Sequence, residues 1–450
     1  MEQKILYELS PSQEVSKLQC AYSIFKRVIN ILTSASTSQQ LDFDLMTKAL
    51  NVCVQRHDCT RIRFVKKGRK LMQYFVDSYE YKDIPLYQFS TKAEQEEFIN
   101  KQSKKAIKYK KGVVLEPTFI KTYDGKSMVF LKVCHMILDA YGINVFIDDL
   151  FNVYNCLKDN QPLPEAPKKF EDLIKKDLIV KHDEEKIKSD YDYFTKVLTE
   201  NPEPYYLGLD GGTNKIASKC RAKNIRPCKM LFVRNKTKLY GHGISKEVCD
   251  KLIAFATEHN TTIANLLMYL YSVTQSRVNN DLDTVLQLEL CNMRGTLLAK
   301  KCSGTKVQSL SCVTKIDKDL SFEENLKTFV EMQSENYRHI GMGDLDMQIL
   351  HHSIYKTSML YTYYSFTFSF IPYRKNGDVE LQFYSNGRCA LPVYAAVMYD
   401  YENNEIGVGY DCQERLVSEQ NIKDFHNNLL YVIEQVIENP TVKVKDIKLK

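Results

Sequence analysis

The order of apolar and polar positions predicts a chain in which helices and strands are mixed. Apolar residues recur with helical spacing in several segments, as at Leu41, Leu45, Ala49 and Val52. The predicted helices are residues 39–55, 92–109, 143–157, 170–199, 246–255, 263–276 and 418–438. Alternating or short apolar runs predict the strands 61–65, 70–77, 113–115, 119–123, 128–133, 229–233, 284–290, 360–370, 393–400 and 405–410.

These helices and strands do not alternate strictly, and no short repeat is present, which together favour an α+β fold. One polar stretch, residues 159–167, reads DNQPLPEAP and carries three prolines without a helical period. It is the best linker candidate in the sequence. The dipeptide Asp124-Gly125 between two predicted strands is typical of a hairpin turn.

The composition narrows the class of protein only slightly. A net charge of +6 suits an anionic ligand or an acidic protein partner, but it is too small to indicate nucleic-acid binding. The longest apolar run, residues 263–273, is far shorter than the ~20 residues of a membrane-spanning helix. We therefore expect neither nucleic-acid binding nor insertion into a membrane.

The cysteines point to a reducing compartment. There are 13, an odd number, and their spacing fits no zinc site. The first ten residues do not have the pattern of a signal peptide. We expect a cytoplasmic protein with reduced thiols and no bound metal.

The clearest chemical feature is a histidine at the end of an apolar strand. His135 follows Val133-Cys134, Asp139 lies four residues further on, and the turn from Ala140 to Gly142 opens the next predicted helix. A neutral imidazole accepts a proton near pH 7, and a strand end anchored in the core holds the ring firmly. The pattern therefore predicts a general base. The alternative is a core histidine that only makes hydrogen bonds.

Other candidates for chemistry have simpler explanations. His57 suits an interaction at a helix C-terminus, and the doublet His351-His352 lacks the context of a metal site. The basic run of residues 104–111 is typical of a solvated surface, or else of a landing site for coenzyme A phosphates or an acidic carrier protein. The aromatic residues between Tyr361 and Phe370 favour core packing over the lining of a binding site.

Four motifs, taken in order, resemble those of one family. Residues 9–13 read LSPSQ, residues 56–64 read RHDCTRIRF, residues 134–140 read CHMILDA, and residues 292–294 read NMR after a predicted strand. They are similar to the L-S-x-x-Q, R-H-E-x-L-R-x-R-F and H-H-x-x-x-D-G motifs, and to a later arginine, of the condensation domains of non-ribosomal peptide synthetases. That family belongs to the chloramphenicol-acetyltransferase-like superfamily, and the resemblance covers essentially the whole chain.

The resemblance implies a fold and a set of roles. It implies two chloramphenicol-acetyltransferase-like lobes that form a pseudo-dimer with a central tunnel, here residues 1–165, which carry the motif, and 166–450. It implies that His135 is the catalytic base and takes a proton from the acceptor. It also implies that Asp139 pairs with Arg294 and that these two residues, with Ala140 and Gly142, support the active site.

The sequence departs from the family pattern at two positions beside His135. Cys134 stands where the family has its first histidine, and Ala140 stands where it has glycine. Adjacent strand residues point to opposite faces, so we expect Cys134 to pack away from the tunnel. Ala140 adds a methyl group where the family's backbone approaches the ligand, which motivates the alternative of reduced activity.

The resemblance leads to one function and leaves alternatives open. It implies an acyltransferase that moves an acyl group from a thioester of coenzyme A or of a carrier protein to an amine or hydroxyl, with no permanently bound cofactor. The alternatives are a carrier-dependent, peptide-bond-forming condensation protein and a non-catalytic binding member of the same fold. The expected partners are a small-molecule acceptor and an acyl or peptidyl carrier protein, and the chain is expected to be a monomer.

Overall fold

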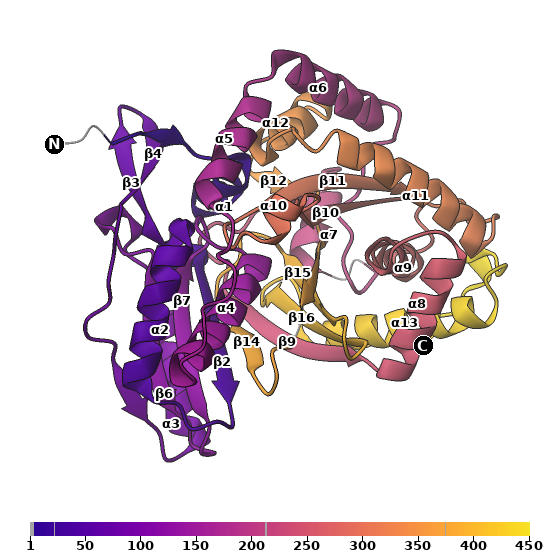
Figure 1. The fold of residues 1–450 in the computed structure, drawn as a ribbon. Helices are drawn as coiled ribbons and strands as arrows, with labels where there is room; N and C mark the ends of the chain where they lie inside the picture. The colour runs from indigo at the N-terminus through magenta and orange to yellow at the C-terminus, as the bar shows by residue number, and fades with distance from the viewer. Residues whose placement is uncertain (1–3, 22, 212–213, 374) are drawn as a thin grey trace. The chain divides into compact units, whose positions relative to one another are not determined.

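The chain folds into two compact units that do not follow its order in sequence. The computed structural model describes residues 4–21, 23–211, 214–373 and 375–450 (Figure 1). The first unit comprises Met1–His182, Asn292–Val307 and Tyr373–Arg388. The second comprises Asp183–Cys291, Gln308–Pro372 and Cys389–Lys450. Two later segments of the chain therefore complete the first unit.

The first unit contains most of the predicted elements around His135. Its helices are α1 (Pro11–Ala21), η1 (Lys26–Ile29), α2 (Phe43–Arg56), η2 (Asp58–Arg61), α3 (Lys92–Ser103), η3 (Tyr109–Lys111), α4 (Ala140–Lys158), α5 (Phe170–Lys181) and α10 (Leu297–Lys300). Its strands are β1 (Tyr7–Glu8), β2 (Asn30–Thr37), β3 (Ile62–Lys67), β4 (Lys70–Phe75), β5 (Leu86–Gln88), β6 (Leu115–Lys121), β7 (Ser127–Cys134) and β14 (Glu380–Tyr384).

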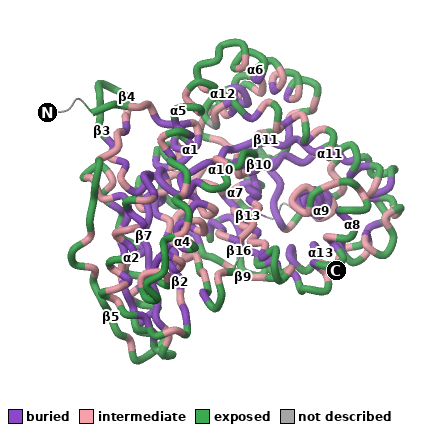
Figure 2. The backbone as a smooth tube through the Cα atoms, viewed as in Figure 1, coloured by how far each residue is buried: buried purple, intermediate pink, exposed green. Residues whose placement is uncertain are grey.

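Strand β7 is the centre of the first unit. It lies in a five-stranded sheet of order β14-β2-β7-β6-β5, pairs antiparallel with both neighbours, and is buried along its length (Figure 2). Val129, Leu131 and Val133 share one core with apolar residues of α2 and α4, while Met128 and Phe130 belong to a smaller core that α3 helps to cover. Burial on both faces fixes the end of the strand, where His135 follows.

The second unit contains the remaining elements. Its helices are α6 (Glu184–Thr199), α7 (Lys215–Arg221), α8 (Lys246–Glu258), α9 (Ile263–Val278), α11 (Phe322–Arg338), α12 (Asp344–Ile354), α13 (Glu419–Glu438) and η4 (Val444–Asp446). Its strands are β8 (Cys228–Lys229), β9 (Thr237–Ile244), β10 (Thr284–Asn292), β11 (Val307–Lys315), β12 (Tyr361–Thr362), β13 (Thr367–Tyr373), β15 (Val393–Asp400) and β16 (Glu405–Gln413). Strands β10, β11 and β13 each share one terminal residue with the first unit.

A six-stranded sheet and four helices form the core of the second unit. The strand order is β11-β10-β13-β15-β16-β9. Apolar residues of α8, α9, α11 and α13 pack with residues of this sheet in one cluster. Helix α9 is buried from Leu266 to Ser276, as its continuous apolar run predicts.

Most predicted helices and strands are confirmed. Ser245 and Ser418 accept N-cap hydrogen bonds at the starts of α8 and α13, and Gly125 has the positive φ of 82° that the predicted hairpin needs. The predicted strands at residues 113–115 and 119–123 are instead one strand, β6. Helix α3 ends at Ser103, six residues earlier than predicted, and the lysine-rich segment after it is a loop with a short 3₁₀ turn.

The division of the chain differs from the one expected at residue 165. Residues 161–169 have no regular structure, as the proline-rich stretch predicts, yet α5 beyond them still belongs to the first unit. Residues 292–307 and 373–388 belong to it as well. A proline-rich stretch indicates only where helices and strands are interrupted. The unit to which a segment belongs depends instead on long-range contacts, which no local sequence pattern contains.

One buried acid in the second unit makes a specific prediction about stability. Burial raises the pKa of Glu289 from 4.5 to about 7, although its hydrogen bonds from Tyr337, Cys291 and Gln333 oppose the shift. An unfolded chain ionises this group at lower pH than the folded chain does. The stability that neutral Glu289 contributes is therefore complete below about pH 4.5 and is lost as the pH rises through 7.

We predict that Glu289→Gln removes this pH dependence. The free energy of unfolding of the wild type, measured with urea between pH 4.5 and 8, should contain a decline on the order of a few kcal/mol that the variant lacks. The matched control is Glu247→Gln, because Glu247 is an exposed residue that pairs with Lys251. Equal pH profiles for the wild type and Glu289→Gln would show that this acid is already ionised in the fold.

Candidate functional site

The backbone around His135 is held by hydrogen bonds on both sides. The N–H of His135 donates to the carbonyl of Ile29 (2.9 Å), next to the start of β2. The Ser16 hydroxyl of α1 donates to the carbonyl of His135 (3.4 Å). His135 is half-buried, and its Nδ1 atom is buried. The ring therefore projects from a backbone that the core has fixed in place.

The residues similar to the L-S-x-x-Q motif support this same turn. Gln13 is fully buried and donates from Nε2 to the carbonyl of Met136 (3.0 Å), the residue after His135. Its Oε1 accepts from the N–H of Ser10 (2.9 Å), and its amide group also exchanges hydrogen bonds with the buried Gln73 of β4. The motif at the start of the chain thus positions the strand end that carries the histidine.

Asp139 and Arg294 form a buried, bidentate ion pair. The Arg294 guanidinium donates from Nη1 to Asp139 Oδ2 (2.9 Å) and from Nη2 to Oδ1 (3.0 Å), and both side chains are almost completely buried. Arg294 also donates to Asn292 and to the carbonyl of Gly304 and lies over the Tyr141 ring. The structure thus brings together the two residues that the resemblance pairs, 155 positions apart.

The Asp139 carboxylate also organises the backbone. It accepts from the N–H of Gly142 (2.7 Å) as the N-cap of α4, and from the N–H of Lys306 (2.7 Å). Burial alone would raise the pKa of Asp139, but the charge and hydrogen bonds of Arg294 outweigh it and lower the pKa. The group is therefore an anion at neutral pH.

Gly142 is required by a close backbone approach. A Cβ atom built on Gly142 would lie 1.7 Å from the carbonyl oxygen of Ser303, which no side-chain rotation can relieve. Ala140, in contrast, is the first residue of α4 and is half-buried. The additional methyl group of Ala140 thus lies two residues before Gly142, the position at which this turn cannot accept a Cβ atom.

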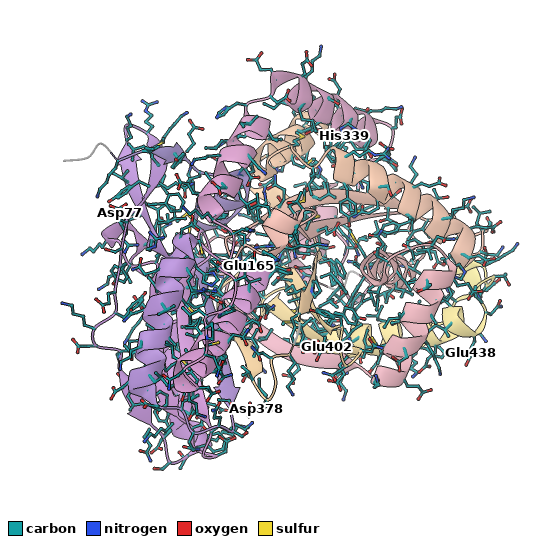
Figure 3. All side chains as sticks on the ribbon, in the orientation of Figure 1. Asp77, Glu165, His339, Asp378, Glu402 and Glu438 are labelled. Atoms are coloured by element: carbon teal, nitrogen blue, oxygen red, sulfur yellow. The ribbon has the colours of Figure 1, made fainter. Side chains whose placement is uncertain are left out.

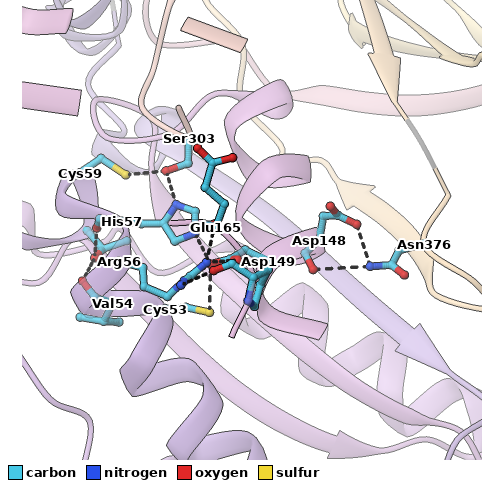
Figure 4. Close-up of polar contacts among 12 residues, drawn as sticks. Cys53, Val54, Arg56, His57, Cys59, Asp148, Asp149, Glu165, Ser303 and Asn376 are labelled. Atoms are coloured by element: carbon cyan, nitrogen blue, oxygen red, sulfur yellow. Dashed lines mark hydrogen bonds and ion pairs between the residues drawn. The ribbon is translucent and has the colours of Figure 1, made fainter. Parts of the chain in front are cut away.

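Ser303, His57 and Asp149 form a hydrogen-bonded row (Figure 4). His57 Nδ1 lies 2.7 Å from Ser303 Oγ, and His57 Nε2 lies 3.0 Å from Asp149 Oδ2. Arg56 binds both oxygens of the same carboxylate, and hydrogen bonds from His57 and Arg56 overcome the effect of burial and lower the pKa of Asp149 to about 2.

This row contains the residue types of a hydrolytic triad, but the positions of its side chains indicate that it holds the backbone of the first unit in place. Ser303 is 2% and His57 1% exposed, so the serine oxygen offers no surface to a substrate. Ser303 instead carries the carbonyl that meets Gly142 and precedes Gly304, whose carbonyl binds Arg294. His57 is also the C-cap residue of α2, as predicted, but its ring contacts were not evident from the sequence.

The remaining motif residues are structural as well. Asp58 accepts from the N–H groups of Phe170 (2.7 Å) and Glu171 (3.0 Å) and so satisfies the first turn of α5. Burial raises the pKa of Asp58. Arg61 donates to the carbonyl of Val54 in α2 and to those of Val76 and Asp77, and so ties α2 to the residues that follow β4. In the sequence RHDCTRIRF, the side chains of His57, Asp58 and Arg61 thus all make hydrogen bonds within the first unit.

The other candidates are Cys134 in the first unit and a histidine doublet in the second unit. Cys134 is buried in the core of the first unit, and burial raises its thiol pKa well above the usual value, so it packs as predicted. His351 and His352 lie on α12 in the second unit. Within the described residues, no group of three or more histidine, cysteine or acidic side chains is placed to hold a metal ion.

The comparisons with known proteins show the family to which the chain belongs. The family model for the condensation domain matches residues 3–450, so the chain belongs to the condensation-domain family. Condensation domains are acyl and peptidyl transferases, and the chain is a transferase at this general level. Within the described ranges, no helix has the length and apolar character needed to cross a membrane.

The curated relatives are synthetases, and the chain matches only a part of each. The chain is 22% identical to surfactin synthase subunit 3 of Bacillus subtilis (strain 168) over an alignment of length 470 that covers 99% of the chain and 34% of that protein. It is 19% identical to bacitracin synthase 3 of Bacillus licheniformis over an alignment of length 427 that covers 91% of the chain and 6% of that protein. The chain thus spans a minor part of the length of either relative.

Solved structures establish the fold. The starter condensation domain of rhizomide synthetase in complex with C8-CoA has a TM-score of 0.81 at 12% identity, and the match covers 99% of this chain and 98% of that one. The first condensation domain of the calcium-dependent antibiotic synthetase in complex with a substrate analogue has a TM-score of 0.80 at 14% identity, with 99% of each chain covered. The predicted two-lobed, chloramphenicol-acetyltransferase-like α+β fold is confirmed.

We predict that Arg294→Ala destabilises the protein by about 3–5 kcal/mol, because it leaves the Asp139 charge buried without its partner. The measurement is the free energy of unfolding in urea at pH 7. The matched control is Lys301→Ala, which removes a cation from an exposed pair with Glu165, a residue labelled in Figure 3, and should cost less than about 1 kcal/mol. A loss for Arg294→Ala as small as that of the control would contradict the structural role of the pair.

Proposed function

We propose that this chain transfers an acyl group from a thioester to an amine or a hydroxyl, with His135 as the general base. The single observation that carries the proposal is the position of His135. It follows a fully buried strand, its backbone is held by Ile29 and Ser16, and the neighbouring Met136 is held by Gln13. A family of transferases supplies the reaction class.

The proposed reaction uses one proton acceptor and no metal or bound cofactor. The acceptor nitrogen or oxygen attacks the thioester carbonyl carbon while His135 takes its proton. The tetrahedral intermediate then collapses, the carbon–sulfur bond breaks, and the leaving thiolate gains the proton that His135 took, which returns the imidazole to its neutral form. Because Nδ1 of His135 is buried, Nε2 is the nitrogen we assign to the acceptor's proton.

The donor is a thioester of coenzyme A or of a separate carrier protein. The rhizomide synthetase starter domain was solved with C8-CoA, which supports an acyl-CoA donor by analogy. Curated relatives are peptide synthetases, which supports the carrier-bound variant in which the product is a peptide bond. We also expect a monomer that acts in the cytoplasm, where all 13 cysteines, none of them in a disulfide, stay reduced.

We predict that His135→Ala lowers acceptor-dependent thiol release by about a hundredfold or more. The measurement is free-thiol release from a panel of acyl-CoA and acyl-carrier thioesters with mixed amine and alcohol acceptors. The matched control is Cys134→Ala, which changes the adjacent, buried residue and should keep most of the rate. Release that survives in His135→Ala would contradict the assignment of the base, whatever the donor.

We further predict that the wild-type rate stays high at mildly acidic pH. Burial lowers the pKa of His135 from 6.5, and the raising effects of its backbone hydrogen bond and of Asp139 do not cancel the shift. A base is active when neutral, so the rate should fall only as the pH drops below 6.5. The measurement is kcat/KM between pH 5 and 8 with a hydroxyl acceptor, which does not ionise in this range, and a midpoint above 6.5 would oppose this assignment.

A further inference from the structure

A turn after β14 lies beside the backbone that holds His135. Asn386, two residues after the strand, donates from Nδ2 to the carbonyls of Val28 (3.5 Å) and Asn30 (3.0 Å). The residue between those two, Ile29, is the one whose carbonyl accepts from the N–H of His135 (2.9 Å). All of these residues belong to the first unit. The turn and the proposed base are therefore neighbours within one compact unit.

Two arginines lie against one aromatic ring in the same region. The guanidinium carbon of Arg27 lies 5.6 Å from the centroid of the Phe25 ring, and that of Arg388 lies 3.7 Å from it. Nη2 of Arg27 also approaches the turn itself, since a Cβ atom built on Gly387 would lie 3.9 Å from it. An aromatic face attracts a cation but does not neutralise its charge. Two positive charges are thus held close together beside the turn.

Arg27 has no polar partner among the residues that the structure describes. Its Nε atom is buried without a hydrogen bond, and no described carboxylate lies within ion-pair distance of its guanidinium. The two Nη atoms are not buried, and the residue as a whole is half-buried. Burial and the charge of Arg388 both lower the pKa of Arg27, and no described acid opposes them. A partly buried cation without a counter-ion is costly, so this one needs an explanation beyond packing.

The chemistry of Arg27 selects an anion with two oxygens in one plane. A guanidinium presents its N–H donors in a planar fork, which matches a carboxylate. Arg388 adds a second positive charge, and the half-buried ring of Phe25 offers an apolar surface to a carbon chain. The hydrogen bonds that we assign to an anion come from Arg27 alone.

The distance from Arg27 to His135 suits a small substrate. Arg27 lies two residues before Ile29, which a backbone hydrogen bond joins to His135. Two residues of chain span about 7 Å, and residues opposite each other in an antiparallel pair are about 5 Å apart, so the Cα atoms of Arg27 and His135 lie within roughly 12 Å. The two side chains and a substrate of a few carbon atoms can span this distance together.

We propose that Arg27 binds a carboxylate of the substrate, with Arg388 adding positive charge beside it. The inference rests on the proposed function, because it names the class of substrate that the transferase accepts. The carboxylate can come from two sources. It belongs either to the acceptor, which is then a free amino acid, or to the acyl donor, which is then the monothioester of a dicarboxylic acid.

The test compares substrates that differ by one carboxylate. In the acceptor arm, leucine is compared with leucinamide, and the donor is the N-acetylcysteamine thioester of hexanoate. In the donor arm, the N-acetylcysteamine monothioester of hexanedioate is compared with that of hexanoate, and the acceptor is leucinamide. In one arm, Arg27→Gln should lower the ratio of kcat/KM for the carboxylate to kcat/KM for its neutral analogue by about tenfold or more. The arm that responds identifies the source of the carboxylate.

The matched control is Arg69→Gln, which removes the same charge from the exposed turn between β3 and β4 of the first unit. It should leave both ratios unchanged. Arg27→Lys keeps the charge but loses the planar fork, so its ratio should lie between those of the wild type and Arg27→Gln. The unfolding midpoint of Arg27→Gln should be unchanged or higher, because the side chain has no hydrogen bond or ion pair with the described residues to lose.

A phosphate also matches the fork of an arginine, so a further donor separates the two anions. The N-acetylcysteamine thioesters contain no phosphate, whereas hexanoyl-CoA does. Hexanoyl-CoA is therefore assayed with the wild type and with Arg27→Gln. If Arg27→Gln lowers only the rate with hexanoyl-CoA and changes neither carboxylate ratio, Arg27 binds a phosphate and the proposal is wrong.

A second readout needs no turnover and keeps this inference distinct from the proposed function. Phenylglyoxal labels accessible arginines, and peptide mass spectrometry follows Arg27 and Arg69 separately. Leucine or hexanedioate should slow the labelling of Arg27 but not of Arg69, whereas leucinamide and hexanediamide should slow neither. Protection of Arg27 without any thiol release would support the site and contradict the proposed function. No protection, together with ratios that Arg27→Gln leaves unchanged, would overturn the site even if His135-dependent transfer is observed.

Discussion

The arrangement around His135 depends on one buried negative charge. The carboxylate of Asp139 receives two hydrogen bonds from Arg294 and one from each of two backbone N–H groups, those of Gly142 and Lys306. In this way it joins the start of α4 to a segment more than 150 residues away. Without the charge, Arg294 would lose its counter-ion while remaining buried. The turn that follows His135 is therefore held by an anion, while the backbone of the histidine itself is held by Ile29 and Ser16.

Much of the site was accessible from the sequence, because its key residues follow local rules. A histidine after an apolar strand, an aspartate at a helix start and a glycine in the turn are each recognisable from their neighbours. The pairing of Asp139 with Arg294 came only from the family resemblance. The contacts of Ser303 and Asp149 with His57 had no signal at all, since these residues are ordinary in their local sequence and meet only in the fold.

The helices and strands could be predicted from the sequence about as well as the residues of the site. Long helices such as α9 and α13 were placed within a few residues, because a continuous apolar run marks α9, and one buried stripe after a capping serine marks α13. The loop after α3 was missed, since its lysines favour a helix intrinsically but offer no apolar face to bury. The membership of residues 292–307 and 373–388 in the first unit depends on tertiary contacts, which local patterns do not contain.

Because residues 292–307 and 373–388 belong to the first unit, they determine when this unit can finish folding during synthesis. When residue 182 leaves the ribosome, the first unit still lacks Arg294 and the edge strand β14. Asp139 then has no cation, and β2 exposes an unpaired edge. The N-terminal unit is therefore completed only after most of the second unit has been made. Domains usually fold in order from the N-terminus, but here the first unit needs segments from later in the chain before it is complete.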